Sequence, residues 1–178
     1  MARVRRTLAE IVVEEGLIDE EGATTIEREA RRSGQPIVQA FAAQVPEASL
    51  AMALSRRLRL PVVQLDAEPL DPDALRELSQ EIACRRLLVP LSLESPVEGP
   101  RILHVAMADP TDRDAIAEVE IATGCRVAPA LATVTAIDDA IDRAYHGTAT
   151  AIMKVDRPAA AEPPRRVPFG GDLPFATP

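Results

Sequence analysis

The sequence has few aromatic residues, two cysteines and a single lysine. Its 178 residues include no Trp, one Tyr and three Phe, so the hydrophobic core must be built from aliphatic side chains. Cys84 and Cys125 are too few for a disulfide scaffold, and we expect reduced thiols. The only lysine, Lys154, has no glycine-rich loop beside it. A Walker-type phosphate loop, and with it P-loop NTPase chemistry, is therefore excluded for this sequence.

Positive charge and long apolar runs are also scarce. Twenty basic and 28 acidic residues give a net charge of -8, and this balance argues against non-specific nucleic-acid binding, which needs clustered cations. No apolar run approaches the roughly 18 residues of a membrane span. The arginine-rich start lacks the apolar stretch of a signal peptide. We expect a cytoplasmic protein that binds no nucleic acid and inserts into no membrane.

The residues that are present divide the chain into three parts. Residues 1–60 carry helical patterns, with Gly16 and Gly34 as C-terminal caps and Asp19 as an N-cap, and predict a helical subdomain of two helical hairpins. Residues 61–147 predict an α+β subdomain. Residues 148–178 are rich in Pro and Ala and predict a flexible tail. Phe169 and Phe175 in this tail are candidate partner-binding residues.

The second part should hold a small, mainly antiparallel sheet flanked by helices. Residues 62–65 could form a short strand, and one helix is expected from Asp71 to Ile82 and beyond. Alternating apolar residues predict strands near 87–93 and 102–107, paired as a hairpin, with Pro90 marking an edge or a bulge. A further helix, a strand over 126–131 and a last helix complete the α+β class.

The sequence contains no catalytic constellation and no metal-ligand spacing. His104 falls on an expected strand and His146 at an expected helix end, and neither has a partner at ligand spacing. The carboxylates fall at helix starts or on solvated faces, where nothing raises their pKa as a general acid requires. We therefore expect no enzyme, no catalytic residue and no metal or cofactor. An unfamiliar site around carboxylates or His104 is the remaining enzymatic alternative.

Several segments resemble a known family. Leu60–Asp66 (LPVVQLD), Val105–Asp112 (VAMADPTD), Thr123–Val127 (TGCRV) and Ala140–Tyr145 (AIDRAY) resemble the N-terminal domain of type II secretion and type IV pilus assembly ATPases. The resemblance covers about residues 7–147. It implies a non-catalytic domain that precedes a motor and couples it to partners. The chain looks like a stand-alone version without the motor, or one cut before it.

The resemblance implies two alternative functions. The first is docking on a protein of a secretion, pilus or motility assembly, with recruitment to the inner membrane through that partner. The second is binding of cyclic di-GMP, which some family members hold through tandem helical motifs. Residues 7–18 keep the apolar skeleton and central glycine of the first motif, but its arginine position holds Thr7. Under this alternative the nucleotide-binding residues are Arg5, Arg6, Leu8, Gly16, Leu17 and Ile18.

Overall fold

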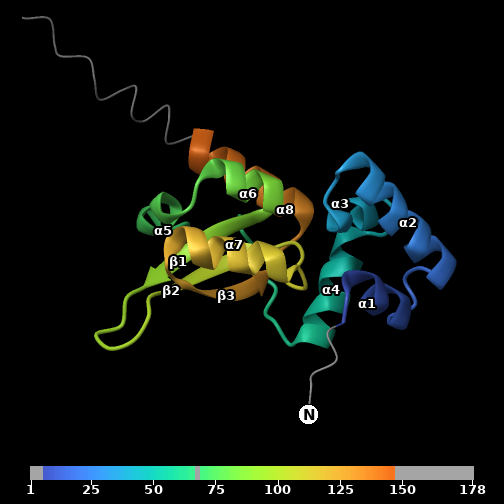
Figure 1. The fold of residues 1–178 in the computed structure, drawn as a ribbon, viewed down its shortest axis with the longest axis horizontal. Helices are drawn as coiled ribbons and strands as arrows, with labels where there is room; N and C mark the ends of the chain where they lie inside the picture. The colour runs from blue at the N-terminus through green and yellow to red at the C-terminus, as the bar shows by residue number, and fades with distance from the viewer. Residues whose placement is uncertain (1–5, 67–68, 147–178) are drawn as a thin grey trace, which may run out of the picture.

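The computed structural model describes residues 6–66 and 69–146. Four helices come first: α1 (Leu8–Glu14), α2 (Glu20–Ser33), α3 (Ile37–Ala42) and α4 (Glu47–Leu58). The second group contains α5 (Pro72–Glu77), α6 (Gln80–Arg86), β1 (Leu88–Glu94), β2 (Ile102–Met107), α7 (Arg113–Thr123), β3 (Arg126–Leu131) and α8 (Val134–Ile141), and ends in a wide turn, η1 (Asp142–His146). The two groups lie side by side (Figure 1). This arrangement confirms the predicted α+β class.

Local capping determines where the first helices begin and end. The Thr7 hydroxyl accepts a hydrogen bond from the backbone N–H of Glu10, whose carboxylate accepts from the N–H of Thr7, and this reciprocal pair starts α1. Asp19 caps α2 through the N–H of Gly22 at 2.8 Å. Gly34 ends α2 in the left-handed conformation, at φ +69°. The predicted roles of Asp19 and Gly34 are confirmed.

The sheet is mixed, whereas the sequence predicted a mainly antiparallel one. The strand order is β1-β2-β3; β1 and β2 form the predicted antiparallel hairpin, but β3 runs parallel to β2. The reason is α7, because a helix between two strands carries the chain back to the end where the first strand began. Pro90 lies in the edge strand β1 next to a register shift, as predicted.

Two further predictions need correction. The single helix expected from Asp71 is two helices, because Leu78 is extended (φ -125°, ψ 132°) and Ser79 caps α6. The break places the Leu78 carbonyl where it accepts a hydrogen bond from the Tyr145 hydroxyl at 2.9 Å. The strand expected over residues 62–65 is only one parallel bridge, between Val62 and Leu131.

The buried side chains of both groups form one continuous core. It runs from Ile11 of α1 and Phe41 of α3 to Leu103 of β2 and Ile137 of α8. One polar link joins the groups as well: the Glu47 carboxylate at the start of α4 accepts hydrogen bonds from the backbone N–H and the hydroxyl of Thr135, at 3.0 and 2.8 Å. The described helices include none long and apolar enough to cross a membrane.

Candidate functional site

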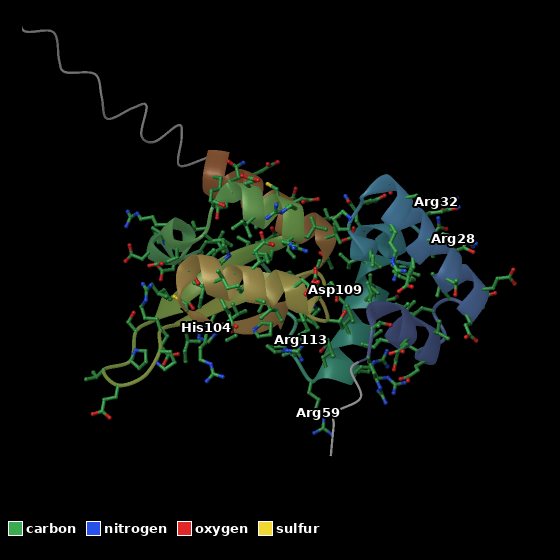
Figure 2. All side chains as sticks on the ribbon, in the orientation of Figure 1. Arg28, Arg32, Arg59, His104, Asp109 and Arg113 are labelled. Atoms are coloured by element: carbon green, nitrogen blue, oxygen red, sulfur yellow. The ribbon has the colours of Figure 1, made fainter. Side chains whose placement is uncertain are left out.

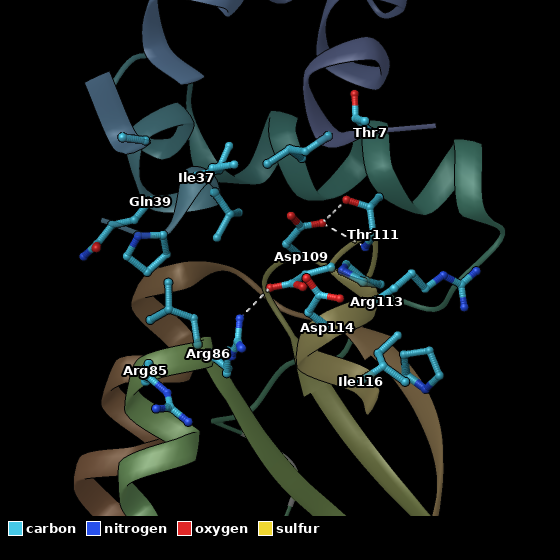
Figure 3. A pocket seen from close by; sticks show the side chains of 18 of the residues that line it. Thr7, Ile37, Gln39, Arg85, Arg86, Asp109, Thr111, Arg113, Asp114 and Ile116 are labelled. Atoms are coloured by element: carbon cyan, nitrogen blue, oxygen red, sulfur yellow. Dashed lines mark hydrogen bonds and ion pairs between the residues drawn. The ribbon is translucent and has the colours of Figure 1, made fainter. Parts of the chain in front are cut away.

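A large groove lies where the two groups of helices meet. Its volume is about 1890 Å³. The first group contributes the start of α1, the turn between α2 and α3, and the end of α4, while the second contributes the end of α6, the turn before α7 and part of β3 (Figure 3). Small-molecule sites usually occupy about 300–1,000 Å³. The groove is therefore larger than a site built to enclose one small molecule.

The turn from β2 into α7 is the most structured part of the groove. One carboxylate oxygen of Asp109 accepts hydrogen bonds from the N–H and the hydroxyl of Thr111, at 2.8 and 2.5 Å (Figure 3). Asp112 then caps α7 through the N–H of Ala115 at 3.0 Å. Burial raises the pKa of Asp109, against the lowering effect of the Thr111 hydrogen bonds. The sequence prediction that nothing raises the pKa of a carboxylate is wrong for this residue and for Asp138 of α8, whose pKa burial also raises.

Most arginines that line the groove are bound to carboxylates. Arg86 at the end of α6 donates to Glu118 at 2.7 Å and to Asp112 at 3.4 Å, and Arg85 also contacts Glu118. Arg57 donates to Glu15 at 2.6 Å. The remaining pairs are Arg6 with Glu14 at 3.3 Å and Arg31 with Glu27 at 3.6 Å. The pairs of Arg57, Arg85 and Arg86 connect different helices, whereas those of Arg6 and Arg31 are local to α1 and α2.

Two arginines on the groove differ from the others. The side chains of Arg59 and Arg113 are exposed, and neither makes a hydrogen bond or an ion pair with any residue that the structure describes (Figure 2). Sequence reasoning missed both. For Arg59 a signal existed, because no acidic residue stands within four positions of it in the sequence. For Arg113, which lies between Asp112 and Asp114, no local pattern could have shown that it has no partner.

The predicted nucleotide-binding residues do not come together in one cavity. Arg6 and Leu8 line the large groove, whereas Ile18 lines a separate hollow of about 530 Å³ beside α2. Gly16 and Leu17 line neither. Arg5 lies outside the described residues, as do the predicted partner-binding residues Phe169 and Phe175.

The structure describes the side chains of one histidine, His104, and of both cysteines. The His104 imidazole lies 3.4 Å from the Glu94 carboxylate across the hairpin. Cys125 is buried and Cys84 exposed, and both are free thiols. Between residues 6 and 66 and between 69 and 146, no three His, Cys, Asp or Glu side chains are grouped as metal ligands.

The fold is similar to that of solved proteins. One solved structure is that of MshE with cdg (cyclic di-GMP). Its sequence is 24% identical to this chain, and the match has a TM-score of 0.56 and covers 79% of this chain and 99% of that one. The structure of the N-terminal domain of XpsE is also 24% identical, with a TM-score of 0.60 over 82% of this chain and 99% of the other. At these identities the similarity concerns the fold alone.

Sequence comparison identifies the family. The type IV pilus assembly ATPase PilB of Myxococcus xanthus (strain DK1622) is 28% identical over 140 residues, which make up 78% of this chain and 24% of PilB. The chain thus spans about a quarter of the length of this relative. Residues 58–151, just over half of the chain, match the family model of the MshEN domain. The chain therefore belongs to the MshEN domain family, as the resemblance found in the sequence implied.

Proposed function

We propose that this chain is a non-catalytic docking module for a protein of a secretion, pilus or motility assembly. The observation that carries the proposal is the MshEN match, because the similar protein PilB is a type IV pilus assembly ATPase and the matched region holds no phosphate-binding loop. The helices up to residue 60 and the α+β region over 61–147 act together in it. The module acts in the cytoplasm and reaches the inner membrane through its partner.

The described side chains support an interaction role. The groove is wide, and most of its charged groups are already paired within the protein. Asp109, a groove carboxylate whose pKa is raised by burial, accepts two hydrogen bonds from Thr111 within the turn before α7.

A two-hybrid screen tests the docking proposal. The full chain is paired in turn with the cytoplasmic segments of each secretion and pilus component from the same genome. We expect at least one component to interact, and we expect purified protein to confirm the complex by isothermal titration. If no component binds the chain, while cyclic di-GMP binds it at micromolar concentration or below, the docking proposal is wrong.

Cyclic di-GMP binding is the second candidate function. It is favoured by the similar fold of MshE, whose structure was obtained with cdg, and by the central Gly16 at φ +70°, which leaves open space beside the backbone. The proposed contacts are Arg5, Arg6, Leu8, Gly16, Leu17 and Ile18. The pairing of Arg6 with Glu14 weakens this candidate, because a ligand would have to break that pair.

Calorimetric titration with cyclic di-GMP separates the two candidates. If the chain is a receptor, cyclic di-GMP should bind it at micromolar concentration or below. Arg6→Ala should weaken this binding, whereas Arg32→Ala, on the outer face of α2, should leave it unchanged. Docking function predicts no binding to either variant or to the unmodified chain at that concentration.

A further inference from the structure

We propose that one end of the groove binds a short segment of a partner protein in which carboxylates stand next to apolar side chains. The inference rests on the docking function proposed above and adds its place and chemistry. This end consists of Arg59, Leu60, Arg113, Ile116 and Pro129, and we refer to it as the basic end.

The two guanidinium groups of the basic end are the reason for an acidic partner. Arg59 and Arg113 are exposed and unpaired within the described part of the chain, whereas the other arginines lining the groove are paired with carboxylates. A guanidinium binds a carboxylate through two parallel hydrogen bonds, which gives both strength and orientation. An acidic segment would supply the missing partners.

The basic end also has apolar residues, which line the same groove as the two arginines. Val62 pairs with Leu131 in parallel, and the N–H of Leu131 donates to the carbonyl of Pro61 at 2.9 Å. Leu60 and Pro129 of β3 both line the groove. Leu60, Pro129 and Ile116 are each only partly buried, so they leave apolar surface for a partner's side chain. Figure 3 shows Ile116 on the same side of the groove as Arg113.

The backbone at Arg59 points to a role outside folding. Arg59 ends α4 in a left-handed conformation, with φ 58° and ψ 41°. At the same position α2 ends in Gly34 and α7 in Gly124. A side chain is strained there, and glycine would fit better. Leu87 has a similar conformation, but its side chain is buried in the core, which explains its presence. The exposed side chain of Arg59 has no such packing role.

The carboxylates on the groove do not satisfy the basic end from within. Asp109 is bound to Thr111, and Asp112 caps α7 and contacts Arg86. Asp138 comes from α8, which contributes nothing to the basic end. Asp114 is exposed next to Arg113 and makes no ion pair with a described residue. Its negative charge should repel an acidic segment, so its replacement by Asn should strengthen binding.

The test is a selection from a random dodecapeptide library displayed on phage, with the full chain as bait. Affinities of the selected peptides are then measured by fluorescence anisotropy. We expect sequences in which Asp or Glu stands next to an apolar residue. Arg59→Gly and Arg113→Ala should each weaken binding about tenfold or more, while Asp114→Asn should tighten it. Arg32→Ala, which removes an exposed arginine away from the groove, should change affinity less than twofold.

The variants distinguish lost binding from lost folding. Arg59→Gly should raise the melting temperature while it weakens binding, because it removes the backbone strain together with the charge. Peptides that bind the Arg59 and Arg113 variants as well as the unmodified chain would overturn the inference and leave the docking function standing. Peptides without acidic residues, displacement by cyclic di-GMP, or an empty selection would each overturn it too. If the two-hybrid screen also fails, the docking function itself is wrong.

Discussion

The helices α1–α4 and the sheet region are held together in different ways. Charged side chains join α1 to α4, where Glu14 and Glu15 contact Arg56 and Arg57 on the surface. Backbone ladders join the strands, and the central strand is buried on both faces from Val105 to Met107. Exposed ion pairs contribute little to stability, whereas buried strand pairing and packing contribute much. The helical region can thus vary its surface charge with little effect on the fold.

The β3 edge of the sheet offers no free N–H group to an added strand. The backbone nitrogens of β3 that point away from β2 belong to residues 127, 129 and 131. Val127 donates to the Glu120 carboxylate at 3.1 Å, Pro129 has no N–H, and Leu131 donates to the carbonyl of Pro61. Within this described strand no outward N–H remains for an added strand. This is consistent with the docking that we propose in the groove between the two regions.

The largest effect should come from core truncation, which tests whether the two regions fold as one unit. Phe41→Ala in α3 and Leu103→Ala in β2 each remove a fully buried side chain. We expect losses of about 3–5 and 2–5 kcal/mol in the free energy of unfolding. Because the core is continuous, both variants should shift the same single transition in urea. Two separate transitions, each shifted by only one variant, would show that the regions unfold independently.

The titration of Tyr145 should have an effect of intermediate size on the free energy of unfolding. Burial raises its pKa to about 12, and it is the only tyrosine in a chain without tryptophan. Absorbance at 295 nm should therefore show one titration with its midpoint near 12. Because the unfolded state loses this proton at a lower pH, stability should fall as the pH rises from about 10 towards 12. A midpoint near 10 in the folded protein would contradict the placement of this ring.

Tyr145→Phe separates the hydrogen bond from the burial. The variant removes the hydroxyl that donates a hydrogen bond to the Leu78 carbonyl. We expect a loss of about 1 kcal/mol in the free energy of unfolding, measured in urea below pH 8. The fall in stability above pH 10 should be reduced in the same variant.

The polar link between the regions should have a smaller effect. Thr135→Val removes the hydroxyl that donates to Glu47 but keeps the backbone N–H donor. We expect about 0.5–1 kcal/mol of destabilisation by urea unfolding, because the bond is exposed. Glu47→Gln should cost no more than this when combined with Thr135→Val, since both changes act on the same contact. Fully additive losses would mean that Glu47 and Thr135 act separately.

The ion pairs of the helical region should have the smallest effect. Arg57→Ala removes contacts to Glu14 and Glu15, and we expect a loss of about 0.2–1 kcal/mol that shrinks further in 1 M salt. Urea unfolding at low and high salt measures it. A loss as large as that of Leu103→Ala in β2 would contradict the contrast between the two regions.

Much of the fold could be predicted because its signals are local. The caps at Asp19 and Gly34, the hairpin and the position of Pro90 depend on a few neighbouring residues. The parallel pairing of β3 could not be read from its own pattern, since direction depends on the path of α7. The carbonyl that the break at Leu78 leaves outside a helix accepts from Tyr145, 67 positions further along the chain, and no local pattern shows this contact.

The candidate site was less predictable because it depends on which charges find partners. Arg6 was a reasonable ligand candidate from its place beside the first motif, but Glu14 lies within reach of it once α1 forms. Arg59 and Arg113 belong to distant segments that meet only in the folded groove. The raised pKa of Asp109 likewise follows from burial by surrounding elements, whereas its sequence neighbours indicate only a turn.

We propose that the groove between the two regions is the docking surface. Amide chemical shifts of the full chain, measured as the best selected dodecapeptide is added, test it most directly. We expect shifts concentrated at Arg59, Leu60, Arg113 and Ile116, and we expect Arg59→Gly to weaken them. Shifts concentrated at residues 16–18, or spread over the sheet far from the groove, would contradict it.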